Sequence, residues 1–260
     1  MSLLRGVAKA LFAGFDTFLR SPPGPRILIY HQVGVTRGLQ MEVGEEDFEW
    51  QLEWLLANRR IVDLETAVRT WNEAGADQLV VLTFDDGYED TFTTAFPHLR
   101  EREIPFVLYL ATQHIEEQSP LSGGAPLKWE AVCSMVDSGL VTIGAHTHTH
   151  RDLRKLSAEE IANEVSICDE IILKRTGVRP RDFAYPWGYW SPSADEVIRD
   201  RYLTAVLGAP TKTSDEVDAM LIHRFPVQRS DGTRWFRNRL VGGLLVEERV
   251  RRRLRGYEGP

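Results

Sequence analysis

Short segments of continuously apolar residues alternate along this chain with segments of helical periodicity, and this alternation restricts the fold more than any other feature. The apolar segments are predicted strands at residues 26–31, 78–84, 105–111, 140–146, 182–186 and 204–208. Helical patterns occupy residues 47–57, 90–102, 128–138, 158–176 and 195–201. Strands that are apolar throughout are typical of parallel sheets covered by helices. The chain is therefore predicted to be an α/β protein, either a barrel or a doubly wound sheet.

The length of 260 residues suits one large domain that buries its core without disulfides. Cys133 and Cys168 each lie in an apolar helical pattern, so we expect two buried free thiols and a reducing compartment. The net charge of −7 argues against nucleic acid as the main partner. The charge and composition leave the oligomeric state open.

Residues 1–25 combine an amphipathic helical pattern with the proline-rich break "SPPGP". Charged residues interrupt the apolar positions, and no small-residue cleavage site precedes the break, so neither a membrane span nor a secretory signal is expected. We interpret the segment as a helix that packs on the domain or lies on a membrane surface. A cytoplasmic protein is therefore expected, with peripheral contact at the inner face of the membrane as a further hypothesis.

Arginine is concentrated between Arg224 and Arg255, and residues 231–260 are predicted to form an arginine-rich helical tail. One interpretation is a terminal helix in solvent. The alternative is a surface for an anionic membrane or substrate.

Polar residues follow several strands at their carboxyl ends, where chemistry gathers in both architectures. Asp85 and Asp86 follow the strand at 78–84 and precede Gly87, which suits a tight turn. His146 ends the strand at 140–146. An aspartate after a strand can also cap the next helix, so "DDG" alone leaves a structural role open.

The segment "HTHTH" places histidines at 146, 148 and 150. On a strand all three would share one face, whereas on a helix only His146 and His150 would. Buried imidazoles need partners for their nitrogens, which makes such a triplet unusual in a core and favours a metal site. One aspartate and two histidines form the facial triad that binds a divalent ion and leaves positions open for water and substrate.

Three stretches, "TFDDGYED", "GAHTHTHRDL" and "FAYPWGYW", in this order, resemble the motifs of the polysaccharide deacetylases, carbohydrate esterases with a nodulation-factor-deacetylase-like domain. Subsidiary pieces "YHQV", "LKWEAV" and "HRFPVQRSD" extend the resemblance to roughly residues 26–228. The resemblance implies a distorted (β/α) barrel. The predicted organisation is a terminal helix at 1–25, a catalytic domain at 26–230 and the tail at 231–260.

The resemblance also implies roles for single residues. Asp85 would be the general base, and Asp86, His146 and His150 would hold a divalent metal, with Zn favoured over Co, Ni or Fe. Thr147 would stabilise the loop, and His148 would be the variable position, with its ring pointing away from the metal. The backbone N–H of Trp187 would stabilise the oxyanion.

The chain departs from the family pattern at two places. Ala184 stands where the third motif often has an arginine that orients the catalytic aspartate. The family's late Leu-x-His motif corresponds to Leu221 and His223, so His223 is expected to be the general acid, with a packing or surface role as the alternative. His31 is expected to line the site, and His98 and His114 to be exposed.

The expected function is a metal-dependent hydrolase that removes N-acetyl groups from an amino-sugar polysaccharide or glycolipid and releases acetate. Aromatic side chains near the strand ends would contact the N-acetylated sugar. The alternatives are a deacylase of a non-carbohydrate amide and a catalytically silent sugar-binding relative. The substrate-binding residues expected from the motifs are Tyr88, Tyr185, Pro186, Tyr189 and His31.

Overall fold

The computed structural model of the chain describes residues 24–34, 37–208 and 218–241, together with residues 243, 247 and 250. Its main element is an eight-stranded sheet in the order β10-β1-β5-β6-β7-β8-β9, with β4 paired to β5. All pairings in this sheet are parallel. The strands are β1 (Arg26–Tyr30), β4 (Arg60–Ile61), β5 (Leu79–Phe84), β6 (Phe106–Leu110), β7 (Val141–Ala145), β8 (Asp182–Ala184), β9 (Thr204–Val206) and β10 (Phe225–Pro226). Two short strands, β2 (Gln32–Val33) and β3 (Glu42–Val43), pair with each other.

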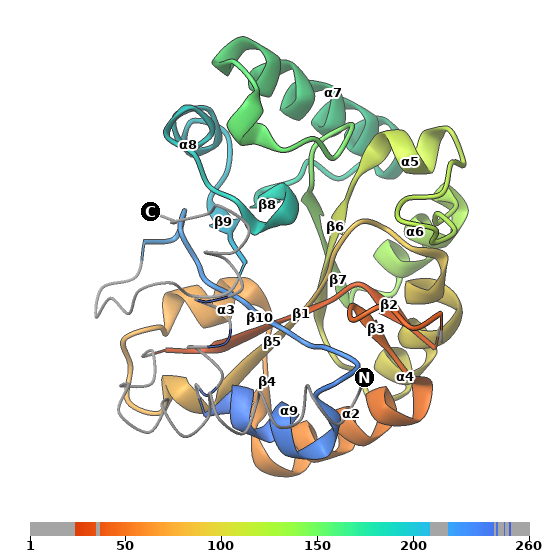
Figure 1. Ribbon diagram of the computed structural model, residues 1–260, viewed down its shortest axis with the longest axis vertical. Helices are drawn as coiled ribbons and strands as arrows, with labels where there is room; N and C mark the ends of the chain where they lie inside the picture. Colours follow the sequence, from red (N-terminus) through yellow and green to blue (C-terminus); the bar gives the residue numbers. More distant parts are fainter. Residues whose placement is uncertain are drawn as a thin grey trace.

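Helices surround this sheet on its outside (Figure 1). They are α2 (Glu45–Asn58), α3 (Leu64–Arg69), α4 (Phe96–Glu101), α5 (Thr112–Glu116), α6 (Trp129–Asp137), α7 (Ala158–Thr176), α8 (Pro192–Arg199) and α9 (Gly232–Leu240). Shorter helical turns are η1 (Ala76–Gln78), η2 (Thr91–Ala95), η3 (Leu153–Lys155) and η4 (Pro186–Gly188). The helix predicted at 158–176 is α7, and its capping box of Ser157 and Glu160 explains why it begins there. The helix predicted at 90–102 consists of the π-helical turn η2 followed by α4.

The sheet curls until its two ends meet. β9 forms an isolated parallel bridge from Val206 to Ile222, and the chain then continues directly into β10, which pairs with β1. Residues from strands at opposite ends of the sheet, such as Ile27 and Val206, share a small apolar cluster, which therefore fills the concave side. Alternate residues such as Leu28 and Phe183 belong to the larger core between sheet and helices. The predicted distorted (β/α) barrel is confirmed.

The strand register brings the carboxyl ends of the strands to one rim. Tyr30 pairs with Phe84, and Leu110 pairs with Ala145. Ala145 in turn pairs with Phe183. The residues that follow β1, β5, β7 and β8 therefore emerge close together.

The described part of the C-terminal arginine region forms the helix α9, which exposes Arg234 and Arg237 but is not wholly in solvent. α9 packs against α2 through Phe236, whose ring contacts Trp50 and Trp54. Arg224 and Arg239 are each 1% exposed. Both lie in ion pairs inside the protein because a buried guanidinium needs a carboxylate partner. Residues 1–23, which carry nearly all of the predicted terminal helix, and residues 251–260, the last third of the predicted tail, lie outside the described residues.

The burial of three further residues differs from expectation. His114 is buried, because α5 turns its ring inward to bond the Ser119 carbonyl and contact Tyr88. His98 is half-buried and pairs with Glu45. Cys168 is buried as expected, but Cys133 is only partly covered, since it lies at the edge of α6 beside the Arg175 carbonyl. None of the described helices is long and apolar enough to cross a bilayer.

Candidate metal centre and active site

Three side chains converge at the rim of the sheet. Asp86 follows β5, and His146 and His150 follow β7. The Asp86 Oδ1 atom lies 3.4 Å from His146 Nε2 and 3.2 Å from His150 Nε2. One ligand atom from each of the three residues lies within 4.8 Å of the others, the spacing of a shared ion.

The hydrogen bonds of this group suit a cation. His146 Nδ1 lies 2.7 Å from the Ala184 carbonyl, to which it donates, so Nε2 is the nitrogen that faces Asp86. Asp86 Oδ1 is buried and accepts no hydrogen bond of good geometry. Burial lowers the pKa of His150 to about 4, so this imidazole is neutral at neutral pH. Lone pairs that face one another in a buried site repel unless a cation lies between them, so the donor set fits a metal ion.

The charge state of Asp86 also suits a metal ligand. Burial opposes its ionisation, but His150 and His146 hold the pKa of the carboxyl well below its ordinary value. Asp86 is therefore an anion, as a metal ligand must be.

His148 lies outside this group. Its Nδ1 is 3.0 Å from the Thr112 hydroxyl, which holds the ring against α5. The three histidines do not share one face because β7 ends at Ala145, before "HTHTH" is complete. The chain then turns through Thr147 and His150, both with positive φ.

Backbone strain is concentrated around these side chains. Left-handed φ values cost non-glycine residues free energy and persist where the surroundings impose them, often at functional sites. Seven non-glycine residues of the described chain have such values, and four of them belong to the rim: Asp86 (φ 74°), Thr147 (φ 68°), His150 (φ 56°) and Trp187 (φ 62°). The turns that aim these residues are therefore specified by the fold.

A buried glutamate of α7 holds the histidine loop. Glu164 accepts hydrogen bonds from the backbone N–H groups of His148 and Thr149 at 3.1 and 2.8 Å, and from the Thr149 hydroxyl at 2.6 Å. The Thr147 hydroxyl accepts from the His150 N–H at 3.1 Å. Sequence reasoning anticipated Thr147 but missed Glu164, because nothing local distinguishes it from the other glutamates of the helix.

Asp85 lies beside Asp86 and is 4% exposed. Its partner is Arg224, which binds both carboxylate oxygens at 2.7 Å. Burial opposes ionisation of Asp85, but Arg224 and then His146 hold its pKa below the ordinary value. Arg224 was missed in the sequence because it lies in "HRFPV", far along the chain from Asp85.

Trp187 and the residues predicted to bind substrate differ in their exposure. Trp187 is 58% exposed, and its ring lies 5.3 Å from that of His150. Tyr185 is fully buried and packs on Phe183, so it does not line an open surface. Tyr88 and Tyr189 are 3% and 8% exposed, and Pro186 is buried as well. Only Trp187 of this group offers a broad exposed face beside the proposed ligands.

The turn η4 presents the backbone of Trp187. Gly188 (φ 69°) follows it, and a Cβ there would lie 2.5 Å from the Gly208 backbone nitrogen, so only glycine fits this close approach. Among the described residues, the Trp187 N–H has no hydrogen-bond acceptor. This donor is therefore available to a ligand.

The two remaining histidines differ in position. His31 follows β1 at the rim, and its charge contributes to lowering the pKa of both Asp85 and Asp86. His223 precedes Arg224, whose side chain enters the concave side of the sheet. His223 itself is half-buried and lies between the bridge residue Ile222 and Arg224. Its role as the general acid stays a prediction.

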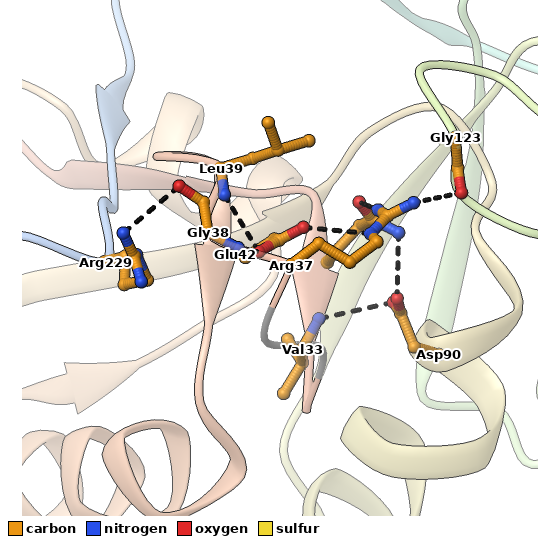
Figure 2. A network of polar contacts seen from close by, with 9 residues as sticks. Val33, Arg37, Gly38, Leu39, Glu42, Asp90, Gly123 and Arg229 are labelled. Atoms are coloured by element: carbon orange, nitrogen blue, oxygen red, sulfur yellow. Dashed lines mark hydrogen bonds and ion pairs between the residues drawn. The ribbon is translucent and has the colours of Figure 1, made fainter.

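A polar network fixes the border of the rim at β2 and β3 (Figure 2). Arg37 contacts Glu42, the Gln32 side chain and the Gly123 carbonyl. Asp90 accepts from the Val33 N–H at 3.3 Å and from the Gln32 side chain at 3.2 Å. Burial raises the pKa of Asp90 to about 7. The network joins the β2–β3 loop to the segment around Gly123 and to the turn that begins at Asp90.

A parallel barrel with an Asp-His-His group at its carboxyl rim defines a class of α/β hydrolases. The sequence profile described as "Polysaccharide deacetylase" matches residues 72–206, just over half of the chain. The chain belongs to the polysaccharide deacetylase family, and it is a hydrolase of this deacetylase class.

Individual proteins agree with this assignment. YxkH of Bacillus subtilis is 24% identical over 209 residues, which cover 77% of this chain and 70% of YxkH. The poly-β-1,6-N-acetyl-D-glucosamine N-deacetylase of Staphylococcus epidermidis is 26% identical over 157 residues, 56% of this chain and about half (54%) of that protein. The structure of IcaB from Ammonifex degensii superposes with a TM-score of 0.70 at 25% identity, over 81% of this chain and 94% of IcaB.

Proposed function

We propose that the protein is a metal-dependent N-deacetylase that hydrolyses the acetamido group of an amino sugar, with acetate and a free amine as products. The observation that carries the proposal is the buried group of Asp86, His146 and His150 with Asp85 directly beside it. Two imidazole nitrogens and a carboxylate are the donor set of catalytic zinc sites, and we propose Zn²⁺ as the ion. A divalent ion held by these three residues would polarise the amide carbonyl and lower the pKa of the attacking water.

The other residues supply the proton transfers and the oxyanion contact. Asp85, kept anionic by its surroundings, would take the proton from the water. The Trp187 N–H would donate to the developing oxyanion. His31 follows β1 at the same rim, and its charge helps to lower the pKa of both aspartates, so we propose it as the donor that protonates the leaving amine, with His223 as the alternative.

An N-acetylated hexosamine is the proposed substrate class. The exposed ring of Trp187 stands next to His150, where it would stack on a sugar face while the acetamido group reaches the ion. The staphylococcal relative is named for poly-β-1,6-N-acetyl-D-glucosamine, which makes this polymer a rational substrate to test.

The test is acetate release by the purified full chain loaded with Zn²⁺, Co²⁺ or Fe²⁺. The substrates are chitooligosaccharides, poly-β-1,6-N-acetylglucosamine, peptidoglycan fragments and lipid-linked amino sugars, with N-acetylated amino acids as non-carbohydrate amides. We expect release from at least one sugar and none after chelation. Release only from the amino acids would indicate the deacylase of a non-carbohydrate amide, and sugar binding without release would indicate the silent relative.

The predicted cytoplasmic location and the peripheral membrane contact rest on sequence patterns at residues 1–25 and 231–260. We propose that the protein meets a substrate presented at the inner membrane face. Cell fractionation tests this, because recovery from the periplasm or the medium would contradict it.

A further inference from the structure

The buried ion pair between Asp85 and Arg224 provides Asp85 with an arginine partner that the third motif lacks. Ala184 stands where related sequences often have an arginine for the catalytic aspartate, and it is fully buried here. Arg224 Nη1 and Nη2 each lie 2.7 Å from one oxygen of Asp85. A two-point contact of this kind fixes the plane of a carboxylate as well as its position.

Arg224 is itself held in one conformation. Its Nε donates to the Leu207 carbonyl at 3.0 Å, and Nη1 also donates to the Thr83 hydroxyl at 2.9 Å. The guanidinium carbon lies 5.3 Å from the centre of the Tyr109 ring. A guanidinium with contacts on its ends and on its face has little freedom to turn, and neither has the carboxylate that it binds.

The arginine comes from the segment that closes the barrel. Ile222 bridges to Val206 of β9, and Phe225 pairs with Leu28 of β1, so Arg224 lies at the seam between the two ends of the sheet. The match to the family profile ends at residue 206 and does not include it. The seam therefore contributes a side chain to the rim as well as closing the sheet.

We propose that Arg224 is a positioning residue, which holds the Asp85 carboxylate in its working orientation. It would replace the arginine that related sequences often have at the position of Ala184, although it comes from a different segment of the sheet. This inference rests on the proposed function, in which Asp85 acts on the water. It predicts that the loss of the guanidinium lowers turnover more than substrate binding, because a misplacement of about 1 Å costs about 10²-fold in rate.

Arg239 offers a matched control. It is 1% exposed, like Arg224, and binds both oxygens of Asp231 at 2.7 and 3.1 Å. This second pair joins α9 to the turn before it and lies outside the proposed site. Both Arg224→Ala and Arg239→Ala remove the guanidinium partner of a buried carboxylate, so both are expected to lower the Tm.

The experiment compares the two variants with the parent chain for kcat, KM and bound zinc per folded protein. For Arg224→Ala we expect kcat to fall about 10²-fold with KM and zinc content little changed. Methylguanidine should restore part of this loss, and Arg224→Lys should lie between Ala and the parent, since an ammonium keeps the charge but not the two-point contact. Arg239→Ala should keep the parent kcat.

Equal effects of the two alanine variants on kcat, or loss of zinc from Arg224→Ala, would overturn the proposal. If the parent hydrolyses no amide, the proposed function fails, and crystal structures of the parent and of Arg224→Ala then decide this inference separately. We expect the Asp85 carboxylate to rotate in the variant. An unchanged orientation would contradict a positioning role.

Discussion

Asp85 and Asp86 are neighbours in the sequence, but their side chains have different partners. Asp86 faces two imidazoles, whereas Asp85 faces a guanidinium. The left-handed conformation of Asp86 turns the chain sharply between them. Two chemically identical side chains are thereby placed in different electrostatic surroundings.

This difference predicts opposite effects of two substitutions. Asp85→Asn should keep stoichiometric zinc and lose at least about 10²-fold in kcat, because a general base typically contributes 10²–10⁴-fold. His150→Ala should lose zinc, since it removes one of three ligands. Elemental analysis and acetate release on the same preparations check both outcomes, with circular dichroism to confirm folding. Equal zinc loss in the two variants would contradict these roles.

At the scale of the element, α7 is part of the site although none of its side chains belongs to the proposed ligand group. Glu164 bonds two backbone N–H groups and one hydroxyl of the loop between His146 and His150. Residues that orient ligands in this way typically contribute 10- to 100-fold in metal affinity.

Glu164→Gln should therefore weaken zinc binding by about 10-fold or more, since an amide accepts less strongly than a carboxylate and brings a donor toward the same N–H groups. Zinc affinity is measured by competition with a chelator. The control is Glu159→Gln, an exposed position on the same helix, which should leave affinity unchanged. A similar loss in both variants would point to a general effect of charge.

At the scale of the whole molecule, the network of Figure 2 joins segments distant in sequence and makes stability depend on pH. Burial raises the pKa of Asp90 from 3.8 to about 7, with Glu42 acting in the same direction and Arg37 and Gln32 in the opposite one. A raised folded pKa means that the stabilising contribution is complete below about pH 4. It is then lost as the pH rises through about 7.

Asp90→Asn should therefore reduce the loss of stability expected between about pH 4 and pH 7. The pKa change corresponds to at most about 4 kcal/mol, and partial exposure screens it to about 2 kcal/mol. Urea unfolding of parent and variant at several pH values measures the difference. If the free energy of unfolding of the parent and of the variant changed with pH in the same way, Asp90 would not be the cause of the pH dependence.

Some features were predictable because they are local. Continuous apolar strands between helical periods predicted the parallel sheet, and the capping box at Ser157 predicted the first residue of α7. The motif spacing pointed to Asp86, His146 and His150, which the structure brings together. Local chemistry did not predict that Tyr185 is buried while Trp187 is exposed, because the turn at η4 decides which ring faces outward.

The sequence by itself determined which residue types stand at the carboxyl ends of the strands, since strand periodicity and side-chain chemistry are properties of neighbouring residues. Only the tertiary structure decided which partners those residues meet. Arg224 reaches Asp85 across 139 positions of sequence because the sheet curls until its ends join. That contact depends on the registers of β10 with β1 and of β1 with β5, and no local pattern records these registers.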